Sequence, residues 1–180
     1  EAKGFLFFVT KKGLCKRVPA SEFESIRQNG KIAISLRDDD ELVAVRLTQG
    51  ENQIIIGAAN GKAVRFDERG VRPMGRNAAG VKGMNVDDSE VIGMCTDQEG
   101  QKILVVSKKG YGKQSVLDEY RLTSRGAKGV KTININQKNG ELVALKAVNG
   151  DEDAKRLLAE SNLRLVVSIS KRYLSFIINK

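Results

Sequence analysis

A repeat of about 49 residues limits the folds open to this chain more than any other feature of its sequence. Two series of glycines recur with spacings of 48 to 50 residues, and an acidic residue before an aliphatic pair recurs at nearly the same interval. The three series are Gly13, Gly61 and Gly110; Gly30, Gly80 and Gly129; and Glu41, Glu90 and Glu141. A period of this length is typical of arrays in which every unit is one small module that packs on its neighbours.

The first half of every repeat predicts a β-hairpin. An apolar run opens each unit, and short runs rich in β-branched and aromatic residues favour buried strands. These runs span residues 6–9, 54–56 and 103–106. A turn around the first glycine follows, because glycine accepts a positive φ, and a basic strand comes after the turn.

The second half of every repeat predicts two more strands. Apolar and polar residues alternate after the second glycine, which predicts a strand with one face in the core, and an aliphatic strand closes the unit. The alternating segments span residues 34–36, 84–86 and 133–135, and the closing segments span residues 42–45, 91–94 and 142–145. The third closing residue is always small, as Ala44, Gly93 or Ala144, which lets a neighbour approach closely. Each unit therefore has about four strands, as propeller blades do.

These units predict one all-β domain of propeller-like, four-stranded blades. The repeat units span residues 5–52, 53–101 and 102–150, and residues 173–180 resemble the start of a fourth. The chain therefore resembles a piece of a longer array. One helix is predicted at residues 153–162, within a segment at 154–172 that interrupts the repeat and has no assigned role.

The charge distribution predicts a polyanionic partner. The net charge is +9, and residues 101–150 hold ten basic and three acidic residues, whereas residues 51–100 hold six and eight. A basic excess in one stretch is typical of nucleic-acid-binding proteins. Basic residues recur near both glycine series, where a glycine-rich loop can present cations and N–H groups to a phosphate backbone. The candidate contacts, expected on one outer rim, are Lys16, Arg17, Arg65, Arg76, Lys82, Lys113, Arg125, Lys128 and Lys131. For Arg76 the alternative is that it braces its turn through carbonyl hydrogen bonds.

The sequence predicts neither a catalytic centre nor a metal site. Histidine is absent, which removes the Ser–His and Cys–His nucleophile pairs and the commonest zinc ligand. Cys15 and Cys95 form no C-x-x-C pair and suggest no disulfide framework, which favours a reducing, cytoplasmic setting. The run at residues 110–113 lacks the spacing of a phosphate-binding loop. The acidic cluster at residues 38–41 has no counterpart in the third repeat, which favours a solvated turn over a cation site.

Several motifs together resemble one family, in the order in which that family has them. The motifs are Phe8-Val9-Thr10-Lys11-Lys12-Gly13, Val71-Arg72-Pro73-Met74-Gly75-Arg76, Gly80-Val81-Lys82-Gly83, Gly110-Tyr111-Gly112-Lys113 and Arg125-Gly126-Ala127-Lys128-Gly129-Val130. They are similar to the C-terminal domain of bacterial DNA gyrase A, and the resemblance runs from residue 5 to 153 and resumes at 173. The glutamine–arginine–glycine box typical of that family's first blade is absent, so the chain is expected to begin near the third blade.

The resemblance implies a β-pinwheel, a disc of about six blades whose basic outer rim wraps duplex DNA and supports negative supercoiling. It implies duplex DNA, the rest of gyrase A, and gyrase B as partners, in the bacterial cytoplasm with the nucleoid. It places the nucleophilic tyrosine, the ATPase, ATP and Mg²⁺ in other parts of the holoenzyme. This chain is therefore expected to be a non-catalytic domain of an ATP-dependent type II topoisomerase, with no cofactor of its own. Two alternatives stay open, namely the homologous domain of topoisomerase IV and a propeller that serves as a protein-interaction scaffold.

Overall fold

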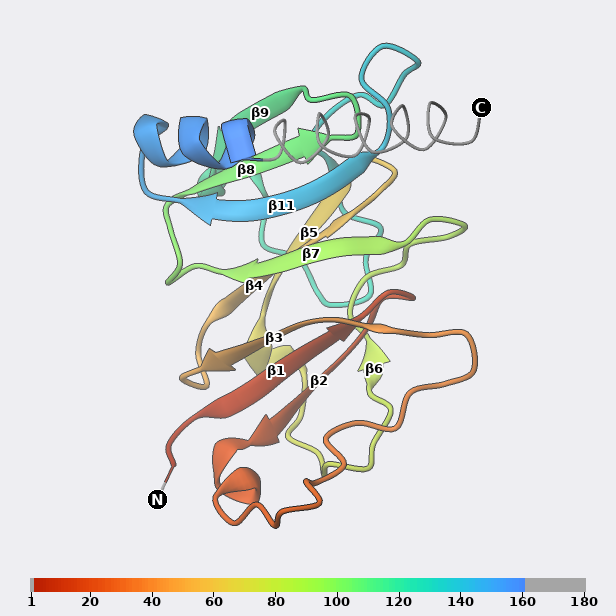
Figure 1. Cartoon of the computed structure of the whole chain (residues 1–180), viewed down its shortest axis with the longest axis vertical. Coiled ribbons are helices and arrows are strands. Elements are labelled where there is room, and N and C mark those ends of the chain that lie inside the picture. Colours follow the sequence, from red (N-terminus) through yellow and green to blue (C-terminus); the bar gives the residue numbers. More distant parts are fainter. Residues whose placement is uncertain (1, 161–180) are drawn as a thin grey trace, which may run out of the picture.

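A computed structural model describes residues 2–160, which form three antiparallel sheets that follow one another along the long axis (Figure 1). Sheet 1 contains β1 (Phe5–Thr10), β2 (Leu14–Pro19), β3 (Leu42–Thr48) and β6 (Val81–Lys82). Sheet 2 contains β4 (Gln53–Ala58), β5 (Lys62–Asp67), β7 (Val91–Thr96) and β10 (Val130–Lys131). Sheet 3 contains β8 (Lys102–Ser107), β9 (Gly112–Val116) and β11 (Leu142–Val148). The predicted all-β array is confirmed, but the third sheet has three strands among the described residues rather than four.

Each sheet is built around a hairpin that turns at the first glycine of its repeat. Gly13, Gly61 and Gly110 have φ angles of 87°, 85° and 86°, in the region where a side chain is disfavoured. The three hairpins are β1–β2, β4–β5 and β8–β9, and each is followed by a short 3-10 turn. These turns are η1 (Ala20–Phe23), η2 (Glu68–Gly70) and η3 (Leu117–Glu119). The sequence therefore predicted the hairpins and the residue that closes each of them.

The fourth strand of sheets 1 and 2 comes from the next repeat. The strand orders are β3-β1-β2-β6 and β10-β5-β4-β7, so the exchanged strands β6 and β10 form the edges opposite β3 and β7. In β6, Val81 pairs with Cys15; in β10, Val130 pairs with Ala63. A blade therefore does not coincide with a sequence repeat.

The prediction that the alternating segments are strands is wrong. Residues 34–36, 84–86 and 133–135 have no strand structure, and the exchanged strands end before the last two of these segments begin. The N–H of Met84 donates to the Gly13 carbonyl at 3.1 Å, so this segment closes over a hairpin turn instead of extending a ladder. Met84 and Val86 are buried, while the N–H of Asn85 donates to the Ala127 carbonyl. In residues 84–86 the alternation therefore reflects a segment that covers a turn and is held by two buried apolar side chains.

The closing strands β3, β7 and β11 lie side by side (Figure 1). The third residue of each was predicted to be small so that a neighbour could approach closely, and Gly93 has such a neighbour. A Cβ added at Gly93 would stand 3.1 Å from the carbonyl oxygen of Leu145 in β11. All three closing strands also shift register at this point, where they pair with the opening strand of their own sheet. The small residue at Gly93 therefore permits the backbones of β7 and β11 to approach each other closely.

A helix begins at residue 151 and continues to residue 160, the last described residue, beside sheet 3 (Figure 1). The sequence predicted a helix at 153–162, so its existence is confirmed and its start lies two residues earlier. The rest of the predicted segment at 154–172, and the partial fourth unit at 173–180, lie outside the described residues.

Candidate nucleic-acid interface

The second glycine of each repeat lies in a loop that follows the 3-10 turn. We call these glycine loops 1, 2 and 3, at residues 26–32, 74–83 and 123–131. Loop 2 ends in β6 on the edge of sheet 1, and loop 3 ends in β10 on the edge of sheet 2. The close approach of loop and hairpin requires glycine, because a Cβ at Gly80 or Gly129 would lie within 2.5 Å of a carbonyl oxygen of the preceding repeat. Loops 2 and 3 therefore occupy the outer edges of two successive sheets, opposite β3 and β7.

An arginine connects each loop to the one before it. The Arg76 guanidinium donates to the Ile32 carbonyl at 2.9 Å, and that of Arg125 donates to the Lys82 carbonyl at 3.1 Å. Ile32 and Lys82 each stand two residues after the repeat glycine, so the two bridges are equivalent. A backbone bond from Gly126 to the Gly83 carbonyl, at 2.6 Å, reinforces the second junction. The three loops thus form one continuous row.

Five of the nine predicted cations are exposed on or beside this row: Lys82, Lys113, Arg125, Lys128 and Lys131. Lys128 forms an ion pair with Asp87 at 3.0 Å, and Lys113 donates to the Thr132 carbonyl at 3.1 Å. Lys82 and Lys131 occupy equivalent positions at the ends of β6 and β10. Neither has a side-chain hydrogen bond or ion pair to any residue between 2 and 160. Their ammonium groups are therefore free to meet a ligand from solvent.

Arg76 is half-buried and holds loop 1 in place. Besides its bond to Ile32, its guanidinium lies 3.6 Å from the Glu22 carboxylate. The sequence offered bracing of its own turn as the alternative for Arg76, but the carbonyl that it reaches belongs to loop 1 of the preceding repeat. Arg125 likewise bonds to the carbonyls of Gly70 and Lys82. Arg125 combines that role with an exposed side chain.

Lys16 does not lie on the outer surface, contrary to the sequence-based expectation. It is fully buried, and its ammonium donates to the carbonyls of Gly75, Arg76 and Ala78 in loop 2, at 3.2, 2.5 and 2.9 Å. Burial, together with the charge of Arg76, lowers the pKa of Lys16 to about 8. The sequence could not reveal this because loop 2 belongs to the next repeat and covers Lys16 only after folding.

Arg17 and Arg65 are also internal, and they occupy equivalent positions in β2 and β5. Arg17 donates to the Val71 carbonyl, and its guanidinium lies 3.6 Å from the buried Glu68 carboxylate. Arg65 donates to the carbonyls of Leu117 and Tyr120, each at 3.0 Å. Each arginine therefore joins its hairpin to the 3-10 turn of the following repeat, and neither is presented as an exposed rim cation.

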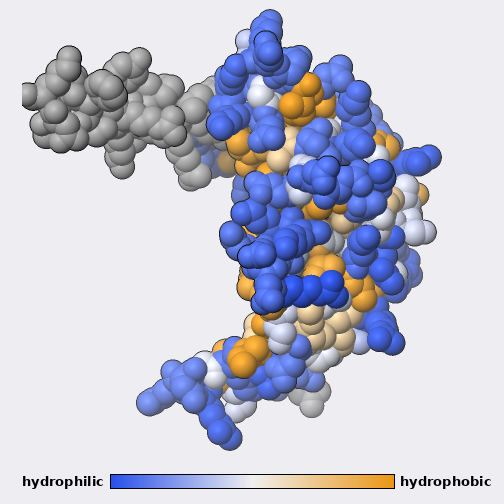
Figure 2. Space-filling model, turned by 90° about the vertical axis from the view of Figure 1, so that its right-hand side faces the viewer, coloured by the Kyte–Doolittle hydropathy of each residue, from blue (hydrophilic) through white to orange (hydrophobic). Residues whose placement is uncertain are grey.

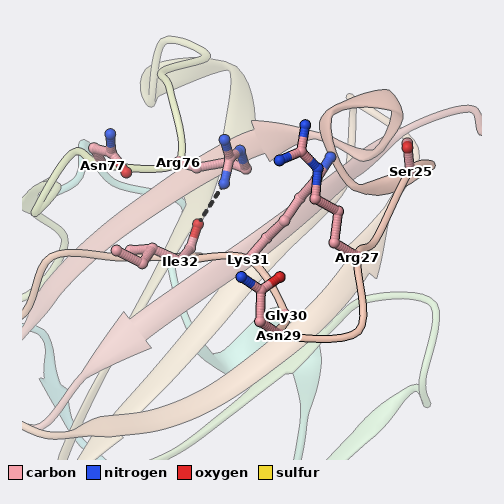
Figure 3. Close-up of a pocket in the computed structure, with 8 residues that line it drawn as sticks. All are labelled: Ser25, Arg27, Asn29, Gly30, Lys31, Ile32, Arg76 and Asn77. Atoms are coloured by element: carbon pink, nitrogen blue, oxygen red, sulfur yellow. Dashed lines mark hydrogen bonds between the residues drawn. The ribbon is translucent and has the colours of Figure 1, made fainter.

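Sequence reasoning missed two cations in loop 1. Arg27 and Lys31 line a hollow of about 500 Å³ together with Arg76, Ser25, Asn29 and Asn77. Figure 3 shows Arg27 and Lys31 among the residues that line this hollow, together with the hydrogen bond from Arg76 to Ile32. Arg27 stands three residues before Gly30, and Lys31 stands one residue after it. In the other two repeats the arginine stands four residues before the glycine and the lysine two residues after it. A search of loop 1 for any cation near its glycine would have found them.

A second hollow of about 510 Å³ lies on the closing strands β3, β7 and β11, away from the glycine loops. The side of the molecule that faces right in Figure 1 is mostly hydrophilic, with small separated apolar patches (Figure 2). Among residues 2–160, no three Asp, Glu, Cys or His side chains come together as a metal-binding group. The same part of the chain contains no helix that is long and apolar enough to cross a membrane.

This geometry defines a class of protein: an array of propeller-like, strand-exchanging sheets whose outer edge carries a continuous row of basic glycine loops. A sequence model of one family matches residues 4–49, 52–94 and 101–149, which is most of the chain. The chain belongs to that family, the DNA gyrase C-terminal domain, beta-propeller.

Individual relatives agree with this assignment. The DNA gyrase A protein of Ureaplasma parvum serovar 3 is 50% identical over 153 residues, or 84% of this chain, and that of Staphylococcus epidermidis is 44% identical over 168 residues, or 92%. The chain spans only 18% of the length of each of these relatives.

Two solved structures are also similar. The C-terminal domain of DNA topoisomerase IV matches with a TM-score of 0.77 and 28% identity over 83% of this chain and 47% of that one. The DNA gyrase A C-terminal domain matches with a TM-score of 0.73 and 27% identity over 84% of this chain and 51% of that one.

Proposed function

We propose that this chain binds duplex DNA, without sequence preference, along the row formed by glycine loops 1, 2 and 3. The observation that carries the proposal is the repeated placement of cations that have no side-chain partner among residues 2–160, because Lys82 and Lys131 stand at equivalent positions on successive sheet edges. A DNA backbone presents phosphates at regular intervals, and cations at regular intervals match it without reading bases.

The chemistry of the exposed groups favours phosphate over base recognition. A lysine ammonium is a compact point charge on a flexible stem, whereas the planar arginine guanidinium has a rigid fork of donors suited to bidentate recognition. Arg76 and Arg125 donate to loop carbonyls, so part of their hydrogen-bonding capacity is already used. We therefore infer that the buried and bridging arginines hold the shape of the row and that the lysines neutralise phosphates.

The position of the row explains how binding would become wrapping. The loops belong to three successive repeats and lie on the outer edge of a stacked array, so a duplex that follows them passes from one sheet to the next. Bending a duplex costs a few kcal/mol, about 1–6 for a smooth bend of 40–90° over 20–30 base pairs, and added phosphate contacts offset that cost. This wrap is the contribution that we propose for the chain in negative supercoiling by the intact gyrase.

The wider setting follows from the relatives, which are DNA gyrase A proteins. We propose that the chain acts as a non-catalytic part of gyrase A, together with the remaining residues of that protein and with gyrase B. ATP and Mg²⁺ would act elsewhere in the holoenzyme, and the setting would be the bacterial cytoplasm.

The homologous domain of topoisomerase IV is the second candidate, because its structure gives a TM-score of 0.77. The two solved structures do not separate the candidates, because the gyrase A domain is 27% identical and the topoisomerase IV domain 28%. The relatives that are 44–50% identical to this chain are DNA gyrase A proteins. We therefore place gyrase first.

Salt titration of DNA binding tests the proposal. The chain should bind random-sequence duplexes with similar affinities, and log affinity should fall linearly with log salt, with a slope near −0.9 for each phosphate neutralised. A protein-interaction scaffold would show weak, salt-insensitive binding to DNA, and a base-reading protein would prefer one short sequence. Either result would refute the proposal.

A further inference from the structure

Adjacent sheets pack on each other through their opening strands, and equivalent residues make the contact in each case. The face of sheet 1 that carries Phe7 and Val9 packs on sheet 2, in a cluster that includes Ile54 and Ile56. The corresponding residue of sheet 2, Ile55, packs on sheet 3. One face of every sheet is therefore the docking surface for the next sheet, and the residues on it stand six and four positions before the first glycine.

The helix at residues 151–160 covers that same face of sheet 3. Leu104 and Val106 stand six and four positions before Gly110, and both are buried in a cluster that contains Ala154. Leu157 and Leu158 pack against this cluster from the helix. Figure 1 shows the helix beside sheet 3, at the end of the molecule away from sheet 1. The apolar contacts made by the next sheet elsewhere in the chain are made here by the helix.

A polar contact repeats in the same way and is independent of the apolar cluster. The residue four positions after the first glycine is Arg17, Arg65 or Gln114. Arg17 and Arg65 reach the 3-10 turn of the next repeat, whereas Gln114 donates to the Asp151 carboxylate at 2.8 Å. Hydrogen bonds from Gln114 and Lys102 hold the pKa of Asp151 below its usual value. The start of the helix thus takes the place of the next repeat's 3-10 turn.

We propose that the helix at residues 151–160 is a cap that occupies the surface on which a fourth sheet would dock. The helix is amphipathic, with Ala154 buried and residues such as Lys155 and Glu160 exposed, as the polar outer face of a capping element requires. Because both occupants need Leu104 and Val106, the docked helix and a fourth sheet exclude each other. With the helix docked, the row of basic loops ends at loop 3. The proposal does not depend on DNA binding.

A cysteine pair in the full chain tests where the helix lies. A Cβ added at Gly112 would stand 2.9 Å from Leu158 Cδ1, so Gly112→Cys with Leu158→Cys should form a disulfide under mild oxidation. Gly112→Cys with Ala159→Cys is the matched control, because Ala159 is exposed on the same helix. Cys15 and Cys95 are buried and would not compete. Failure of the 112–158 pair to cross-link, or equal cross-linking of both pairs, would overturn the proposal.

A charge substitution tests the capping role. Leu158→Asp should lower Tm by more than about 4 °C and increase binding of an apolar dye, because it detaches the helix from Leu104 and Val106. Ala159→Asp introduces the same charge on the same helix and should leave both readouts at wild-type values. If the two variants behave alike, the helix does not cap the sheet. If Leu158→Asp does not fold, the cysteine pairs decide.

Discussion

Replacing Lys82 and Lys131 together by alanine should weaken DNA binding and reduce its salt dependence. Both side chains are exposed at the ends of the exchanged strands, and neither has a side-chain partner within the described part of the chain. Arg125 is a poorer choice, because its guanidinium also joins loop 3 to loop 2. The double variant therefore removes charge from the proposed row with the least disturbance of its shape.

The expected size of the effect follows from counterion release. Each lost phosphate contact lowers the steepness of log affinity against log salt by about 0.9, so the double variant should lose about 1.8. The affinity difference from wild type should be largest at low salt and should shrink by about 1.1 log units between roughly 50 and 200 mM salt. Unfolding free energy should change by no more than ~0.5 kcal/mol per site, because both positions are exposed.

The assay is a fluorescence anisotropy titration of a labelled random duplex at several salt concentrations. The matched control is Lys146→Ala with Lys155→Ala, which removes the same charge from β11 and from the helix. A folded double variant that keeps the wild-type slope would refute the assignment of the row. So would a control variant that loses as much slope, because the effect would then come from net charge alone.

Three further predictions concern the interior. Glu68→Ala should destabilise the fold by about 3–5 kcal/mol in denaturant titrations, because it leaves Arg17 without its buried carboxylate partner; a loss below about 1 kcal/mol would contradict the buried pair. Burial lowers the pKa of Lys16 from 10.5 in the unfolded chain to about 8 in the folded chain. Between these two pH values the unfolded chain binds more protons than the folded chain, so the Lys16 contribution to folding stability should become more favourable as the pH rises. Wild type should therefore gain stability relative to Lys16→Met across this window, and parallel stability curves for the two proteins would count against the burial of the ammonium. Burial raises the pKa of both Cys15 and Cys95 to about 12, so a thiol reagent at neutral pH should label them at the rate of unfolding, and rapid labelling of the native chain would show that they are accessible.

The local features of this protein follow from its sequence alone. The repeat, the hairpins and the closing strands were predictable because strand propensity and the positive φ of a glycine turn depend on a few neighbouring residues. Gly13 and Gly61 turn as predicted, and the small residue at Gly93 meets the close neighbour that its size implied. The helix was predictable for the same reason, since its residues favour helix wherever they pack.

Only the tertiary structure decided which segments complete each sheet and which cations remain outside. β6 and β10 pair with hairpins of the preceding repeat, and no local pattern distinguishes pairing within a repeat from pairing between repeats. Lys16 and Lys82 are both basic residues beside a repeat glycine, yet Lys16 is buried beneath loop 2 whereas Lys82 is exposed. The difference arises because burial depends on what folds over a residue, and in this array the covering segment comes from a distant part of the chain.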